Sequence, residues 1–220
     1  MPAHRFDDYL TAIYILEDEG ETVIAARLAE FLGVSAPTVS QMLRRLQRDG
    51  YVRLDRDRVI RLTAKGERLA ASMVRKHRLL ERWLTEFLQL DWATADEEAH
   101  RLQSALSDVV EERLNERLGR PATCPHGNPI PGNGPRARPL FHPLSEVRPG
   151  TSVVVDRISE LAEEVSPLLN YLGERGIVPG ARFLVKDKNP HAGGLLLEKD
   201  GESVTLALDT AAMVHVREVP

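Results

Sequence analysis

The sequence predicts a mainly α-helical chain with an α+β part, and three observations lead to this fold class. Near the N-terminus, two short amphipathic segments flank Gly33 and a charged, alternating stretch follows them. The middle of the chain is rich in leucines that recur at helical spacing. The last third alternates short apolar runs with glycine-containing turns, which favours a small β-barrel.

The N-terminal part is typical of a helix–turn–helix followed by a hairpin. Apolar residues at near-helical spacing predict one helix over residues 6–16 and a second over residues 23–31. Gly33 permits a left-handed turn, and Pro37 is expected to be the first residue of a third helix that ends at Gly50. The stretch YVRLDRDRVIRLT then alternates about a charged turn and predicts a hairpin.

Two long helices are expected over residues 64–90 and 96–118, because leucines recur there three and four positions apart. Residues 119–149 contain eight of the fourteen prolines and therefore predict a connector without a regular core. Five strands are expected beyond it, in SVVVDRI, ARFLVKD, GLLLEKD, SVTLAL and MVHVREV. The expected domains are residues 1–63, a helical domain over 64–122, a linker over 123–149 and a barrel over 150–220.

The composition restricts the class of protein. A single cysteine cannot form an intramolecular disulfide, and MPAHRFDDYL lacks the apolar core of a signal peptide. No run approaches the roughly 18 apolar residues of a membrane span, so we expect a cytoplasmic protein without a membrane partner. Residues 23–82 hold 14 Lys and Arg against 6 Asp and Glu, although the whole chain has a net charge of −4. This basic segment favours a polyanion as its partner.

The outward face of the third helix suits double-stranded DNA. Its polar side chains are Ser35, Thr38, Ser40, Gln41, Arg44, Arg45 and Arg48. Hydroxyl and amide groups reach base edges, whereas arginines suit phosphates. A solvated face on an ordinary helical hairpin is the alternative. The basic hairpin that follows, with Arg58 in its turn, favours a winged helix, and we expect Pro37 to belong to the same DNA-binding surface.

Four stretches occur in a telling order: SAPTVSQMLRRLQRDGYV, MVRKHRLLERWL, DEEAHRLQSALSDVVEERL and CPHGNPIPG. In these stretches the chain resembles the diphtheria toxin repressor and manganese transport regulator family. The resemblance implies an N-terminal winged helix–turn–helix, a helical dimerisation domain that binds metal, and a C-terminal SH3-like barrel of the FeoA type. It also implies a homodimer that binds an inverted-repeat operator when it carries a divalent metal.

The resemblance implies a metal site that contains His77, Glu81, Cys124 and His126. The first two lie four positions apart, on one face of a helix, and an imidazole with a carboxylate suits a divalent first-row metal. A surface ion pair is the alternative. A proline-framed loop holds the thiol and the second imidazole at a fixed separation. The alternative for Cys124 is a free thiol in a turn.

A carboxylate from the C-terminal domain is expected to complete this site. The segment SELAEEVSPLLNYL offers Glu160, Glu163 and Glu164, and its spacing departs from that of the relatives. Of the three, Glu164 is nominated as the ligand.

A second site is implied at Asp8, His100 and Gln103. Asp8 stands where iron-dependent members have a methionine and manganese-dependent members have an aspartate, and a carboxylate favours the harder Mn(II) over Fe(II). Gln103 and Ser104 replace a Glu-His pair of the relatives, so this site either binds metal weakly, through the Gln103 carbonyl, or is degraded. The acidic neighbours that it offers are Asp96 and Glu98.

The sequence therefore predicts a transcriptional repressor that binds palindromic operator DNA as a homodimer when it carries Mn(II), and that controls genes for metal-ion uptake. It predicts no enzyme, because no nucleophile, base and oxyanion arrangement accompanies the ligands. Zn(II), Co(II) and Cd(II) are expected to replace the metal in vitro, and no small organic ligand is expected. An Fe(II)-dependent repressor of iron homeostasis is the main alternative. A metal-dependent hydrolase with a winged helix is a distant one.

Overall fold

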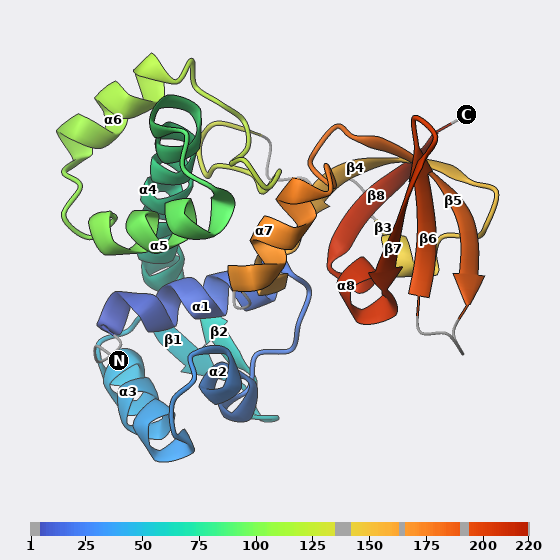
Figure 1. Ribbon diagram of the computed structural model, residues 1–220. Helices are drawn as coiled ribbons and strands as arrows, with labels where there is room; N and C mark the ends of the chain where they lie inside the picture. Colours follow the sequence, from blue (N-terminus) through green and yellow to red (C-terminus); the bar gives the residue numbers. More distant parts are fainter. Residues whose placement is uncertain (1–4, 135–141, 163–165, 190–193, 220) are drawn as a thin grey trace. The chain divides into compact units, whose positions relative to one another are not determined.

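The computed structural model describes residues 5–134, 142–162, 166–189 and 194–219 (Figure 1). The chain forms two compact units, residues 1–76 and 77–220. Helix α4, Ala64–Leu88, contributes its first half to the first unit and its second half to the other. The expected division at residues 63, 122 and 149 stays a prediction.

The first unit is a helix–turn–helix with an antiparallel hairpin. Its elements are α1 (Phe6–Asp18), α2 (Ala25–Phe31), α3 (Ala36–Arg48), β1 (Val52–Leu54) and β2 (Ile60–Leu62). The two strands pair in register, with Val52 opposite Leu62. Residues from all three helices and the hairpin are fully buried: Leu10, Ile13, Leu28, Val39, Leu46 and Ile60. Helical apolar spacing thus marked the core of this unit correctly.

Two helix starts differ from the prediction. Helix α2 begins at Ala25 because the carbonyl of Val23 accepts the amide hydrogen bond of Ile60 at 2.8 Å, which ties this residue to the hairpin. Helix α3 begins one residue before Pro37, and its N-cap is Ser35, whose hydroxyl accepts the amide of Thr38. A serine that binds a free amide of the first turn is a common start of a helix.

The second unit continues with α5 (Trp92–Leu102) and α6 (Asp108–Arg117). The prediction of a single helix over residues 96–118 was wrong. Helix α5 ends at Leu102, and Ser107 starts a new helix by accepting the amide of Val110. The helical part of this unit has its own core, in which α4 and α5 bury Leu80, Leu84, Ala95 and Ala99.

A six-stranded antiparallel sheet forms the C-terminal part of the described chain. Its strands are β3 (His142–Pro143), β4 (Ser152–Ile158), β5 (Arg182–Asn189), β6 (Gly194–Lys199), β7 (Glu202–Ala207) and β8 (Val214–Val219). Their order is β3-β8-β4-β5-β6-β7, and all five predicted strands are present.

Beside these strands, the C-terminal segment contains helices that the sequence did not predict. These are α7 (Ser166–Glu174), α8 (Leu208–Ala212) and the 3₁₀ turns Leu144–Glu146 and Glu160–Ala162. Helix α7 forms because Leu169 and Leu172, three positions apart, both bury against the core of the sheet. Among the described residues, no helix combines the length and apolar character that a membrane span requires.

The proline-rich connector packs closely over its first half, which the sequence did not predict. Every second residue is buried: Cys124, His126, Asn128 and Ile130. A β-bridge joins Thr123 to Pro129. The carbonyl of His126 accepts the amide of Ile158 at 2.8 Å, so the loop is attached to the end of β4.

Candidate metal centre

A buried group of metal-ligand side chains lies between α4 and the loop that follows α6. Glu81, Cys124 and His126 each offer one ligand atom, and these atoms lie within 4.8 Å of one another. Each residue is at most 2% exposed. Glu81 Oε1 lies 3.2 Å from His126 Nδ1. A thiol, an imidazole and a carboxylate form a donor set that suits divalent transition metals. We name these three residues the thiolate cluster.

Glu81 also belongs to a second group, with His77 and Asp96, whose ligand atoms again lie within 4.8 Å of one another. His77 Nε2 is 3.1 Å from Asp96 Oδ1 and 3.6 Å from Glu81 Oε1. Two of these residues project from one face of α4, one turn apart, and Asp96 comes from α5. We name this group the carboxylate cluster, because two of its three donors are oxygens.

The ring of His77 is held from its other side by Gln103. Gln103 Oε1 lies 3.1 Å from His77 Nδ1, and Gln103 Nε2 lies 3.3 Å from His100 Nδ1. An imidazole held at one nitrogen presents the other to a metal in a fixed direction. Gln103 is buried and His100 is exposed. Their geometry supports an orienting role for Gln103, whereas its role as a ligand stays a prediction.

Burial and neighbouring charges shift the pKa values of these groups. Burial alone would raise the pKa of Glu81, but the imidazoles of His126 and His77 outweigh it and lower the pKa. Burial alone would lower the pKa of His77, but Glu81 and Asp96 raise it well above its usual value. Burial raises the pKa of the Cys124 thiol, and the charge of Glu81 raises it further. A metal ion must therefore replace protons when it binds.

Glu81 Oε1 is buried and forms no hydrogen bond of good geometry with any described residue. A buried polar atom left in this way costs about 1 to 3 kcal/mol, and more when it is charged. A cation bound to this oxygen would offset that cost. The donor set and this oxygen together fit a divalent metal ion.

The loop that carries Cys124 and His126 has a fixed backbone. The amide of Cys124 donates to the carbonyl of Asn128 at 2.8 Å, and the amide of Gly127 donates to the carbonyl of Cys124 at 3.0 Å. Gly127 has a φ of 87°, and a Cβ there would collide with the carbonyl of Asp156 in β4. A glycine is therefore required at this turn.

The ring of His126 is further confined by Trp92 of α5. The two rings meet edge to face, with their centroids 4.6 Å apart and an angle of 88° between their planes. Trp92 also packs against the core of the C-terminal sheet.

A buried ion pair lies beside the thiolate cluster. Arg78 Nε donates to Glu160 Oε1 at 2.8 Å, and another nitrogen of the same guanidinium donates to the carbonyl of Pro129. Arg78 is 2% exposed and Glu160 is 5% exposed. This pair ties α4 both to the loop and to the turn that follows β4. Glu164, the nominated ligand from the C-terminal domain, lies outside the described residues.

The implied second site is divided between the two units. Asp8 lies in the first unit, where its Oδ2 accepts the backbone amide of Arg5 at 2.6 Å at the start of α1. Its role as a ligand stays a prediction, as does that of His100.

The sequence predicts Asp96 as a neighbour of the implied second site, but in the structure it faces His77. Glu98 instead pairs with Arg101. The sequence contained a signal for this arrangement. Asp96, Ala99 and Gln103 have the spacing i, i+3 and i+7, which is one face of a helix.

The predicted DNA-binding side chains occupy the solvent side of α3 and the hairpin. The exposed ones are Ser35, Pro37, Thr38, Gln41, Arg44, Arg45, Arg48 and Arg58. Ser40 is half-buried. Arg58 lies in the hairpin turn with a φ of 61°.

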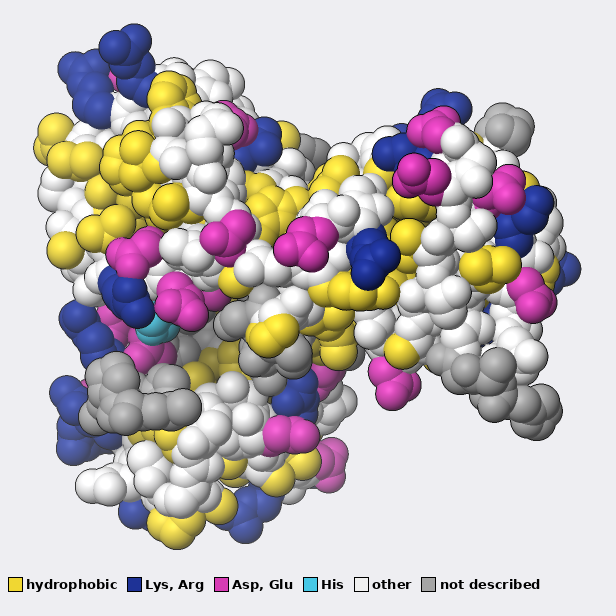
Figure 2. All heavy atoms as spheres, in the orientation of Figure 1, with side chains coloured by type: hydrophobic (Ala, Val, Ile, Leu, Met, Phe, Trp, Pro, Cys, Tyr) yellow, Lys and Arg dark blue, Asp and Glu magenta, His cyan; other side chains and the backbone are white. Residues whose placement is uncertain are grey.

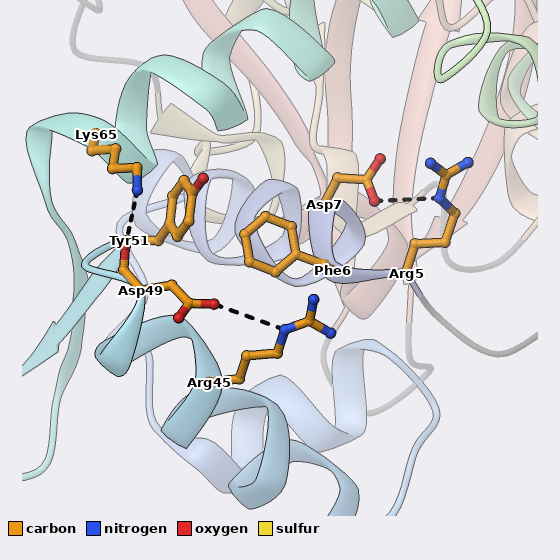
Figure 3. A pocket seen from close by; sticks show the side chains of 7 residues that line it. All are labelled: Arg5, Phe6, Asp7, Arg45, Asp49, Tyr51 and Lys65. Atoms are coloured by element: carbon orange, nitrogen blue, oxygen red, sulfur yellow. Dashed lines mark hydrogen bonds and ion pairs between the residues drawn. The ribbon is translucent and has the colours of Figure 1, made fainter.

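The arginines of α3 differ in their surroundings. Arg45 Nε lies 3.8 Å from Asp49 Oδ2, and its guanidinium lies over the ring of Phe6, 5.7 Å from the centroid (Figure 3). Arg48 Nε pairs with Asp49 Oδ1 at 2.9 Å. The side chain of Arg44 has no ion pair in the part of the chain that the structure describes. Arg44 is therefore the arginine of α3 best placed to take a phosphate partner.

Three family models match the chain in sequence order. The model of the iron dependent repressor N-terminal DNA binding domain matches residues 2–60. That of the iron dependent repressor metal binding and dimerisation domain matches residues 63–132, and the FeoA domain matches residues 142–218. These matches agree with the expected winged helix, metal-binding helical domain and C-terminal domain.

Individual proteins are similar over almost the full length. The chain is 39% identical over 221 residues to the iron-dependent repressor IdeR of Mycobacterium leprae, covering 96% of both chains. It is 35% identical over 219 residues to the diphtheria toxin repressor of Corynebacterium diphtheriae, again covering 96% of both.

Among solved structures, a manganese-dependent transcriptional repressor in complex with manganese superposes with a TM-score of 0.87. It is 34% identical, and the match covers 98% of this chain and 100% of the other. The manganese regulator SloR has a TM-score of 0.79 and 32% identity, with coverage of 98% and 99%. These relatives are transcriptional regulators, which confirms the prediction that the chain is a regulator and not an enzyme. The chain thus belongs to the diphtheria toxin repressor and manganese transport regulator family of metal-dependent transcriptional repressors.

Proposed function

We propose that the protein acts in the cytoplasm as a homodimer that binds a palindromic operator when it carries Mn(II), and that it represses genes for metal-ion uptake. The observation that supports this most directly is the buried carboxylate of Glu81, which stands between two sets of metal-ligand side chains. The first unit then reads DNA, and the helices of the second unit bind metal and the partner subunit.

Mn(II) is the proposed metal because oxygen donors dominate one of the two clusters. Asp96 and Glu81 are hard ligands, and so is Asp8, whose place the family fills with a thioether in iron-dependent members. Fe(II) is the second candidate, because the similar curated repressors are named iron-dependent. Solved structures of the relative ScaR contain Zn²⁺ or Cd²⁺, which supports these ions as substitutes in vitro.

The proposed dimer uses an apolar surface at the ends of the second unit's helices. Large apolar side chains are exposed there: Phe87, Leu88, Leu102, Val109 and Val110. Figure 2 shows hydrophobic side chains gathered over the region in which Figure 1 places α6. Contiguous apolar surface of this kind marks an interaction site. A second copy of the chain would cover it and provide the second recognition helix that a palindrome requires.

Metal and DNA binding are coupled through α4 in this proposal. Helix α4 runs from Ala64 to Leu88, so the segment that bears His77 and Glu81 belongs to the helix that begins in the DNA-reading unit. Glu81, His77 and Asp96 would hold the ion, whose positive charge would offset the negative charge of the two carboxylates from α4 and α5. Thermodynamic linkage requires that the operator and the metal strengthen each other's binding by the same factor. The corresponding coupling free energy is typically about 1 to 3 kcal/mol.

Operator binding measured against several metals tests this proposal. Duplexes would first be selected from a random pool with the Mn(II)-loaded protein. The fluorescence anisotropy of one selected, labelled duplex is then followed in the presence of the protein while Mn(II), Fe(II) under anaerobic conditions, Co(II) or Zn(II) is added. We expect tight binding to depend on metal and to occur with Mn(II). Equal affinity with and without metal would disprove metal dependence, and activation by Fe(II) but not Mn(II) would establish the second candidate.

A further inference from the structure

The two clusters share a single carboxylate oxygen. Glu81 Oε1 is the atom that lies 3.2 Å from His126 Nδ1 on one side and 3.6 Å from His77 Nε2 on the other. The residue is 1% exposed, and no described residue donates a well-formed hydrogen bond to this oxygen. Each set of three ligands is complete only with Glu81.

Charge balance limits what the two clusters can hold together. With a deprotonated thiol, Cys124 and Glu81 carry two negative charges, as many as one divalent ion requires. Asp96 and Glu81 also carry two. Two ions at once would both contact Glu81 and would bring four positive charges against the three negative charges of the described ligands, in a region where Glu81, Cys124 and His126 are buried. Unbalanced charge in a buried region is costly, so simultaneous binding is disfavoured.

The remaining ligands of the two clusters differ in hardness and in the segment that bears them. The thiolate cluster adds Cys124 and His126 from the loop attached to β4, and a thiolate prefers soft ions such as Cd(II) and Zn(II). The carboxylate cluster adds His77 from α4 and Asp96 from α5, and a second carboxylate prefers harder ions such as Mn(II). An ion on either side of Glu81 therefore joins a different pair of segments.

We propose that the two clusters are alternative sites for one ion, and that Glu81 serves only one of them at a time. A soft ion would bind Glu81 together with Cys124 and His126, whereas a hard ion would bind Glu81 together with His77 and Asp96. Metal identity is then distinguished by the side of Glu81 that the ion occupies. This inference rests on the proposed metal-dependent function and specifies which side chains hold a soft ion and which hold a hard one.

The test is a displacement experiment on the full-length protein. The protein is loaded with Mn(II), and bound Mn(II) is counted from the electron paramagnetic resonance signal of the free ion. One equivalent of Cd(II) is then added, and the ultraviolet charge-transfer absorption of a cadmium–thiolate bond reports its arrival at Cys124. The same titration is performed on Asp96→Asn, which identifies the Mn(II) that depends on the carboxylate cluster.

We expect the thiolate absorption to rise while the Asp96-dependent Mn(II) is released, with the affinity for that Mn(II) falling by roughly tenfold or more, as is typical of coupled sites. Asp96→Asn should show the same thiolate absorption but release no further Mn(II). Cys124→Ser should lose the absorption.

The inference would be overturned if the parent protein kept all of its Asp96-dependent Mn(II) after the cadmium–thiolate absorption was complete. This outcome is measured on the parent protein and on Asp96→Asn, so it does not depend on whether a Cys124 variant folds. That result would leave Mn(II)-dependent operator binding intact. A protein that binds the operator equally well without metal would instead refute the proposed function, whatever the displacement shows.

Discussion

At the scale of single residues, the charge on His77 is set by its two carboxylate neighbours. Its Nε2 faces Asp96 and Glu81, and these anions raise its pKa well above 6.5 although burial opposes them. Protonated His77 therefore stabilises the metal-free folded state. This contribution is complete below the ordinary pKa of 6.5 and is lost as the pH rises through the raised pKa of the folded protein.

We expect the metal-free protein to become less stable as the pH rises above 6.5, and His77→Gln to remove most of that dependence. Glu81 acts in another range, because its lowered pKa makes its contribution disappear only in acid, below 4.5. The measurement is the urea midpoint at a series of pH values in the presence of a chelator. An identical pH profile for His77→Gln would contradict this assignment.

At the scale of elements, the loop from Thr123 to Ile130 is placed by a glycine that touches β4. Gly127 and Gly119 both have positive φ, 87° and 75°, so alanine is strained at either position. They differ in what surrounds them. A Cβ at Gly127 would collide with backbone of Asp156, whereas a Cβ at Gly119 meets nothing within 4 Å.

Gly127→Ala should displace the loop from β4 and weaken metal binding by Cys124, whereas Gly119→Ala should cost only about 1 kcal/mol of stability. The cadmium–thiolate absorption and a urea melt measure the two effects. Because both variants introduce the same side chain at positive φ, their difference isolates the contact with β4. Equal cadmium affinity in the two variants would show that this contact does not position the thiol.

Helix α3 presents two kinds of DNA-binding side chain, the amide of Gln41 and several arginines, and variants can separate their roles. Gln41→Ala should reduce discrimination between operator and random DNA by about 1 to 3 kcal/mol per lost base contact. Arg48→Ala should weaken binding to both and lower the salt dependence by about one unit of slope. Fluorescence anisotropy on both duplexes at several salt concentrations provides the comparison. Equal losses on operator and random DNA for Gln41→Ala would exclude it from base reading.

At the scale of the whole molecule, the exposed apolar side chains of α4, α5 and α6 require a covering surface. Val109 is 75% exposed and Val110 is 53% exposed, next to each other at the start of α6. Another exposed apolar residue, Ile24, lies in the first unit, is 42% exposed and belongs to none of these helices. Ile24 therefore serves as a control for Val109 in a test of the dimer interface.

Val109→Glu should convert a dimer into a monomer at micromolar concentration, because a buried carboxylate without a partner is costly in an interface. Ile24→Glu should leave the dimer intact. The molar mass from light scattering, with and without Mn(II), measures the outcome. A monomeric parent protein under both conditions would disprove the proposed assembly.

The sequence alone predicted those features that depend on local pattern. Apolar residues at helical spacing marked α1, α3 and α4, alternation marked the hairpin, and short apolar runs between turns marked the C-terminal strands, because each pattern follows from the geometry of a single element. The resemblance of CPHGNPIPG and MVRKHRLLERWL to the family directed attention to Cys124, His126, His77 and Glu81. The structure groups Cys124 and His126 with Glu81, and it places His77 beside the same Glu81 in a second group with Asp96.

Tertiary structure decided which partners these residues meet. Local spacing places Asp96 on the face of α5 that carries Gln103, but that this face meets His77 depends on how α5 packs on α4. Arg78 and Glu160 are 82 positions apart, and their pairing depends on the folded position of the turn after β4. The sharing of Glu81 has the same origin. Its two sets of neighbours come from different elements, and only packing places both within reach of one buried oxygen.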